Sequence, residues 1–176
     1  MSKLSDKFGI ETKRLRMRRL TLDDADLMLS VWNDPAFIEH VGDREIYTVE
    51  QAQEALINGA FQLYEKYGYG PFRISLRKDD QAIGICGLFR REGYDDADIG
   101  WSTLPPFAGK GYAFEAATAV LDYAHHEVGV ARVLAFISAE NQPSVGLATK
   151  LGLRFERMAR LVGDDEDVCL YSVTHG

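Results

Sequence analysis

Hydrophobic and polar residues alternate over residues 12–20, which predicts a half-buried β-strand at the start of the chain. Thr21 is followed three residues later by Asp24, and this capping-box spacing predicts the beginning of a helix. Apolar residues then recur at helical spacing as far as Trp32. The run Asn-Asp-Pro at 33–35 predicts the end of that helix.

A second helix is predicted over residues 49–67, with Thr48 as its N-cap and the glycines at 68 and 70 at its end. The remaining chain alternates between runs typical of strands and helices. Strands are predicted at 72–76, 82–90, 96–103, 132–138, 153–160 and 168–173, and helices at 112–127 and from 142 or 143 to 151.

Several predicted strands follow one another directly, as in the hairpin whose turn spans residues 77–81. A doubly wound parallel sheet would need strands and helices to alternate, so this order favours a mixed sheet. We expect a single α/β (α+β) domain over residues 1–176, with its core at about 10–174. The sheet is expected to be largely antiparallel, with about seven strands flanked by about four helices.

The overall composition is that of an ordinary globular protein, with 46% hydrophobic and 27% charged residues among 176. A net charge of −7 disfavours binding to the phosphates of nucleic acids. Cys86 and Cys169 lie in apolar runs and are expected to be packing residues, without the spacing of a zinc site. The stretch from Met1 to Ile10 lacks an apolar signal core, and no run is long enough to span a membrane, so a cytoplasmic location is expected.

Two glycines, Gly109 and Gly111, lie immediately before the longest predicted helix. The first backbone N–H groups of a helix lack partners within it, and its dipole is positive at that end. Such a turn suits a diphosphate, and Lys110 adds positive charge. The run is neither the nucleoside-triphosphate P-loop nor the dinucleotide GxGxxG pattern. On these residues alone, a purely structural turn is an equally good interpretation.

Residues 98–116 resemble the acyl-CoA-binding core of the GNAT acetyltransferases, in particular the RimJ/RimL-like branch. Residues 139–153 resemble the Asn-x-x-Ser segment of that branch, and the opening at 11–18 is similar as well. The similarity spans roughly residues 10–174. Two positions differ from the superfamily pattern: Ala108 replaces Gln or Arg, and Ala148 replaces a tyrosine that often acts as the proton donor.

The resemblance implies the GNAT fold, acetyl-CoA as co-substrate and an amine as acceptor. The amine is a protein N-terminus or a small amine, and it attacks the thioester directly. The sheet is expected to open near residues 101–103 to hold the pantetheine arm. The residues implied for cofactor binding are Trp101, Ser102, Thr103, Ala108, Gly109, Lys110, Gly111, Tyr112, Ala113, Asn141 and Ser144.

Ser144 is the candidate for protonating the departing thiolate, although a serine at a helix start also serves as a cap. Asp98 and Asp164 are both candidates for the general base, and the sequence does not rank them. No metal, nucleic-acid or membrane partner is expected, and the protein is expected to be a monomer or a homodimer. A non-catalytic acyl-CoA-binding module on the same fold is the alternative.

Overall fold

The computed structural model describes residues 9–176, so most of the polar stretch from Met1 to Ile10 lies outside the described residues. The strands are β1 (Ile10–Glu11), β2 (Leu15–Arg19), β3 (Pro71–Leu76), β4 (Ala82–Phe89), β5 (Ala97–Thr103), β6 (Arg132–Ile137), β7 (Arg154–Ala159) and β8 (Val168–Thr174). The helices are α1 (Ala25–Trp32), α2 (Pro35–His40), α3 (Val49–Asn58), α4 (Ala60–Tyr67), α5 (Tyr112–Tyr123) and α6 (Gln142–Lys150).

The described strands form one sheet in the order β1-β2-β3-β4-β5-β6-β8-β7. Every neighbouring pair is antiparallel except β5 and β6, which are parallel. The expected mixed, largely antiparallel sheet is therefore confirmed. The strand beyond the expected seven is β1, whose two residues pair with β2.

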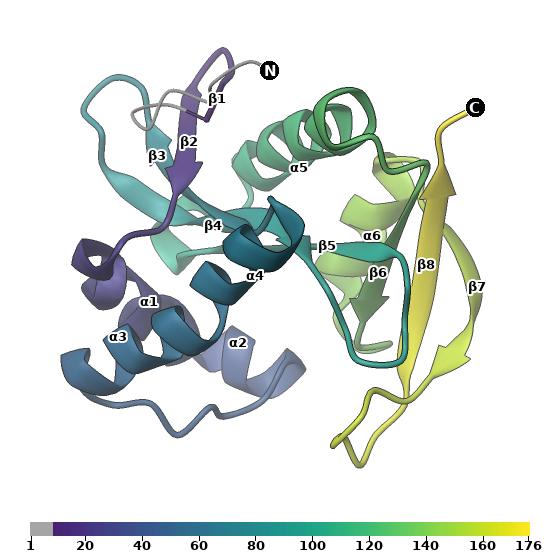
Figure 1. The fold of residues 1–176 in the computed structure, drawn as a ribbon, viewed down its shortest axis with the longest axis horizontal. Coiled ribbons are helices and arrows are strands. Elements are labelled where there is room, and N and C mark those ends of the chain that lie inside the picture. The colour runs from purple at the N-terminus through teal and green to yellow at the C-terminus, as the bar shows by residue number, and fades with distance from the viewer. Residues whose placement is uncertain (1–8) are drawn as a thin grey trace.

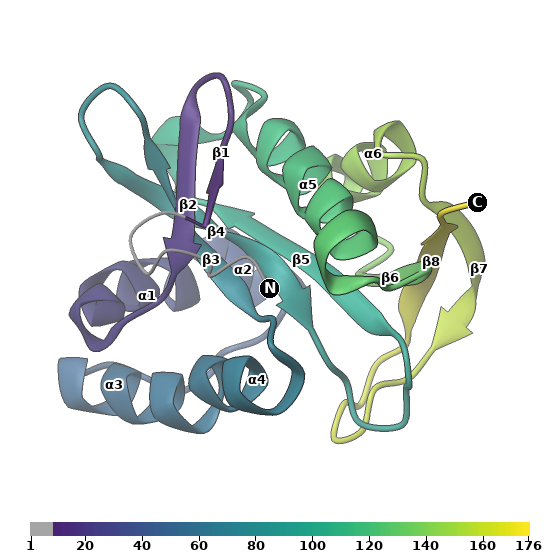
Figure 2. The same ribbon diagram turned by 45° about the horizontal axis from the view of Figure 1, so that its top comes forward.

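Helices cover both faces of the sheet (Figure 1). Helix α5 buries Ala116, Ala117 and Val120 in one apolar core with β3, β4 and β5. These residues recur at helical spacing on one side of α5, and the small alanines let the helix approach the strands closely. Helices α1, α3 and α4 pack in a second core, which Ile85 of β4 joins from the sheet. Figure 2 shows α6 beside α5, over the C-terminal strands.

The helix predicted over residues 49–67 is wrong as one unit, because the chain breaks at Gly59 into α3 and α4. Gly59 has φ −115° and ψ −91°, which lie outside the α-helical region. The proline that was predicted to end the first helix also begins another one. Pro35 is at the first position of α2, where its missing N–H costs no hydrogen bond.

The parallel pair β5 and β6 diverges along its length. Its register contains two pairs, Ala97 with Val133 and Asp98 with Leu134, while β5 continues to Thr103. Along the same stretch, β5 remains paired with β4 on its other side. Residues 99–103 therefore present one open edge, which we call the β5–β6 opening. This confirms the predicted opening of the sheet near residues 101–103.

Candidate active site

The donor turn, residues 108–113, joins the end of β5 to the start of α5. Gly109 and Gly111 have φ values of 72° and 81°, a left-handed conformation that glycine adopts without strain. Within the described chain, the backbone N–H groups of residues 109–114 donate to no backbone carbonyl. Six consecutive free donors at a helix N-terminus form a site suited to an anion.

A side-chain hydrogen bond crosses the β5–β6 opening. The indole Nε1 of Trp101, on β5, donates to Oγ of Ser144, on α6, over 3.1 Å. Both residues are partly buried. The structure thus brings together the two segments that carry the candidate cofactor residues, although they are 43 positions apart in the chain.

The cap of α6 is Asn141, because its side-chain oxygen accepts a hydrogen bond from the backbone N–H of Ser144 at 3.3 Å. The interpretation of Ser144 as the cap is therefore wrong. An indole N–H is only a donor, so Ser144 uses a lone pair to bind Trp101. Its own O–H proton is then available for another acceptor.

Asp98 is buried in the sheet, with 1% of its surface exposed. The guanidinium Nε of Arg91 donates to its Oδ2 at 3.1 Å, while Oδ1 has no hydrogen-bond partner. Burial raises the pKa of Asp98 above its ordinary value, and the charge of Arg91 and its hydrogen bond oppose that rise. Asp164, by contrast, is exposed in the turn between β7 and β8. The two candidate bases therefore differ in environment: Asp98 is buried and bonded to Arg91, whereas Asp164 faces solvent.

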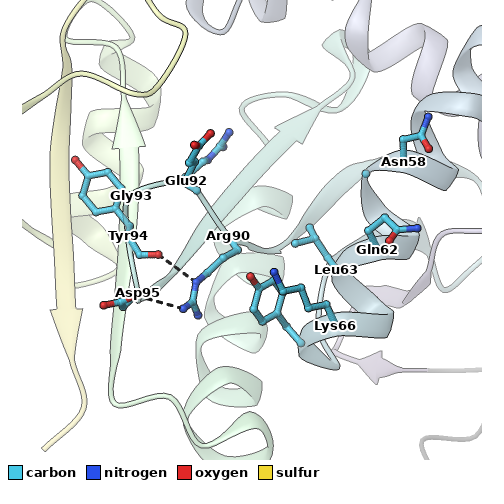
Figure 3. A pocket seen from close by; sticks show the side chains of 12 residues that line it. Asn58, Gln62, Leu63, Lys66, Arg90, Glu92, Gly93, Tyr94 and Asp95 are labelled. Carbon is cyan, nitrogen blue, oxygen red and sulfur yellow. Dashed lines mark hydrogen bonds and ion pairs between the residues drawn. The ribbon is translucent and has the colours of Figure 1, made fainter.

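The face of β5 to which Asp98 belongs follows from strand alternation. Ala97 and Ile99 pack in the core beneath α5, so Asp98 faces the opposite side, where α1, α3 and α4 lie. On that side, α3 and α4 and the loop between β4 and β5 enclose a groove of about 570 Å³ (Figure 3). Arg91 lines this groove and also donates a hydrogen bond to Asp98, so the buried carboxylate lies behind a residue of the groove wall.

Comparison with known proteins identifies the family. The acetyltransferase (GNAT) domain profile matches residues 14–154. The chain belongs to the GNAT acetyltransferase family. The N-acetyltransferase YnaD of Bacillus subtilis (strain 168) is 31% identical over 147 residues, covering 84% of this chain and 83% of the relative.

Solved structures share the fold of this GNAT acetyltransferase. An acetyltransferase from Agrobacterium tumefaciens str. C58 superposes with a TM-score of 0.80 at 23% identity, covering 94% of each chain. RimL, a ribosomal-protein α-N acetyltransferase solved in complex with coenzyme A, gives 0.81 at 17% identity, covering 96% of this chain and 98% of its own. The family uses acetyl-CoA as the acetyl donor.

The residues of this GNAT acetyltransferase fit that donor on independent grounds. The free N–H groups of residues 109–114 match a diphosphate, and the open edge of β5 offers hydrogen bonds to an extended amide-containing arm. Lys110 is exposed beside the turn. Within residues 9–176, no group of three or more His, Cys, Asp or Glu side chains is arranged to hold a metal.

Sequence reasoning missed Arg91, which is the direct partner of Asp98 across the β4–β5 loop. It also missed the groove, which Tyr67 lines from α4. Trp32 of α1 is a core residue, 5% exposed. Both cysteines are buried and free, as expected. None of the described helices is long and apolar enough to cross a membrane.

Proposed function

We propose that this GNAT acetyltransferase transfers the acetyl group of acetyl-CoA to a primary amine by direct attack of that amine on the thioester. The observation that carries the proposal is the row of six free N–H groups at residues 109–114, next to the open edge of β5. The turn holds the diphosphate, and residues 101–103 hold the pantetheine arm. Positioning the two reactants and stabilising the developing oxyanion supply most of the rate.

Asp98 is the proposed general base. A base works best when its pKa is close to the working pH, and burial moves the pKa of Asp98 upward in that direction. Its Oδ1 atom has no partner in the folded protein and is therefore free to accept a proton from the amine, directly or through a water molecule. Arg91 keeps the carboxylate oriented through its bond to Oδ2.

Ser144 is the proposed proton donor to the departing thiolate. Trp101 fixes the position of its oxygen, and its O–H proton is not used in that bond. Ala148, one turn further along α6, offers no tyrosine hydroxyl for this role and is fully buried. Ser144 is thus the residue of α6 whose hydroxyl oxygen is hydrogen-bonded to β5 across the opening.

The acceptor amine is proposed to approach Asp98 from the groove between α3–α4 and the β4–β5 loop. The groove contains aromatic, amide and charged side chains, among them Tyr67, Asn58 and Lys66 (Figure 3). It has room for either a peptide N-terminus or a small amine, and both remain acceptor classes to be tested. Cytoplasmic location and a monomeric or homodimeric state also stay predictions.

The test is an acceptor screen that measures release of the CoA thiol from acetyl-CoA. Peptides with free N-termini, polyamines and amino acids are compared, each with and without the enzyme. Gly111→Glu is expected to abolish both binding and thiol release, because it places bulk and negative charge at a left-handed position in the turn. Gly163→Glu is the matched control, since Gly163 also has a left-handed conformation (φ 89°) but lies in the β7–β8 turn.

Two results would contradict the proposal. Wild-type affinity for acetyl-CoA in Gly111→Glu would show that the donor binds elsewhere. Tight binding of acetyl-CoA without thiol release for any amine would favour the alternative, a non-catalytic acyl-CoA-binding module. Release of thiol with one acceptor class, lost in Gly111→Glu and kept in Gly163→Glu, supports the proposed function.

A further inference from the structure

Arg14 joins the β1–β2 turn to the donor turn, although about a hundred positions separate them in the chain. Its Nη1 donates to the carbonyl oxygen of Lys110 at 3.0 Å, and its Nε donates to Oε2 of Glu115 at 2.6 Å. The guanidinium carbon also lies 4.4 Å from the centre of the Tyr112 ring. One side chain therefore contacts the turn and the first part of α5 at three points.

We infer that Arg14 is a positioning residue for the diphosphate of the donor, acting through the Lys110–Gly111 peptide and through the charge of Glu115. The inference rests on the proposed function, because it takes the donor turn to be the diphosphate site. It assigns Arg14 a role in donor affinity, separate from the chemistry at Asp98 and Ser144.

The first part of the role follows from peptide geometry. In a planar trans peptide the C=O and N–H groups point in opposite directions. Because Arg14 holds the Lys110 carbonyl, the N–H of Gly111 points away from the guanidinium and stays in the row of free donors. A Cβ atom at Gly111 would lie 3.3 Å from Nη2 of Arg14, so a larger residue there would require the guanidinium to shift by a few tenths of an ångström.

The second part concerns a negative charge beside the diphosphate site. Glu115 lies in the first turn of α5, and its Oε1 accepts bonds from the Thr12 hydroxyl at 2.5 Å and the Arg14 N–H at 2.8 Å. Burial raises the pKa of Glu115, but these bonds and the guanidinium outweigh it and hold the pKa below its ordinary value. An ionised Glu115 without Arg14 would repel the phosphates.

Calorimetric titration with CoA tests this role without relying on turnover. Arg14→Ala is expected to weaken CoA binding by about tenfold, since it removes charged hydrogen bonds and leaves the charge of Glu115 without its cation. In the acetyl-transfer assay, the KM for acetyl-CoA should rise by a similar factor while kcat at saturating donor stays unchanged. Arg14→Lys keeps the charge but lacks the forked geometry, so it should restore part of the affinity.

Two further variants separate positioning from simple bracing. Glu115→Gln removes the negative charge and leaves an oxygen to accept from Arg14, so CoA affinity should be kept. Arg77→Ala is the matched control, because Arg77 Nη1 donates to the Thr12 carbonyl at 3.0 Å and braces the same β1–β2 turn without contacting the donor turn. It should leave CoA affinity unchanged.

The results that overturn the inference are distinct from those that overturn the proposed function. Wild-type CoA affinity in Arg14→Ala, or an equal loss in Arg77→Ala or Glu115→Gln, shows that Arg14 acts only as a structural brace or not at all. Failure of the wild-type protein to bind CoA overturns the proposed function itself.

Discussion

The buried carboxyl of Asp98 is held by Arg91, which also lines the proposed acceptor groove. A buried carboxylate is usually neutralised by several hydrogen bonds or a full ion pair. Asp98 forms one ion pair, through the single hydrogen bond from Arg91 to Oδ2, and its other oxygen accepts no hydrogen bond. This arrangement costs stability when the group ionises, and it is the arrangement expected of a base that must accept a proton.

We predict that ionisation of Asp98 makes the folded protein less stable as pH rises. Its folded-state pKa is raised by burial, so the protonated form is favoured by folding. Its contribution to stability is fully present below the ordinary value of 3.8 and is lost as pH rises through the raised pKa. The free energy of unfolding of the wild type minus that of Asp98→Asn should therefore fall as pH rises through this range.

Chemical unfolding of both proteins at pH values from 4 to 8 measures this difference. The contributions of the other titrating groups are common to both proteins and cancel. A difference that does not change with pH would contradict the raised pKa. Asp98→Asn should also lose most acetyl transfer at every pH, because an amide cannot accept the amine proton. CoA affinity should be kept in this variant, since Asp98 lies at the closed end of the β5–β6 opening.

We predict that Ser144→Ala lowers kcat by about a hundredfold, the lower range for loss of a general acid. The start of α6 should stay intact, because the backbone N–H of residue 144 still donates to Asn141. Steady-state kinetics at saturating acetyl-CoA gives the value. Thr149→Ala is the matched control, as it removes another hydroxyl of α6 that bonds to the helix backbone. Equal kcat for wild type and Ser144→Ala would exclude the acid role.

At the scale of elements, the Trp101–Ser144 bond joins β5 to α6 where the strands have separated. We predict that Trp101→Phe, which keeps an aromatic ring but removes the donor, costs about 1 kcal/mol of stability. A double-mutant cycle with Ser144→Ala should be non-additive, because either change breaks the same bond. Thermal or chemical unfolding of the four proteins tests it, and additive losses would show that the bond contributes nothing.

The sequence predicted those elements whose signals are local. The capping box from Thr21 to Asp24 is present, and the glycine turn ends where α5 begins. The break at Gly59 was missed because a helix tolerates one glycine at modest cost, so a glycine alone does not mark a break. Its backbone conformation depends on how α3 and α4 pack on the sheet.

Contacts between distant segments were beyond any local pattern. Arg14 and Glu115 are 101 positions apart, and their pairing depends on the β1–β2 turn reaching the start of α5. Arg91 approaches Asp98 because the loop after β4 turns back toward β5. The candidate donor turn could be located from residue types, since glycine spacing encodes its conformation. The pairing of charges beside this turn could not be predicted, because it depends on the tertiary fold.

For the whole molecule, two sets of strands meet at β5 and β6. Strands β1 to β5 form an antiparallel set, which packs with helices α1 to α5. Strands β6, β7 and β8 form the second set, which packs with α6 (Figure 2). The register between the two sets contains two residue pairs, and the Trp101–Ser144 bond adds a side-chain link. Acetyl-CoA bound in the β5–β6 opening would contact both sets of strands and strengthen the connection between them.

We predict that acetyl-CoA stabilises the protein by linking these two sets. At a concentration of one hundred times Kd, binding adds about 2.7 kcal/mol, which corresponds to a rise in Tm of about 5 to 10 °C for a chain of this size. Hydrogen exchange should slow in residues 99–103, at the N–H groups that face the open edge, and in residues 109–114, whose N–H groups bond to no backbone carbonyl in the protein alone. Helix α3, which packs in the second core, should not change. Gly111→Glu should show neither effect.

Two results would contradict binding of acetyl-CoA in the β5–β6 opening. One is an equal rise in Tm with ATP, and the other is protection from hydrogen exchange confined to α3 and α4. Neither result requires a ligand at the free edge of β5.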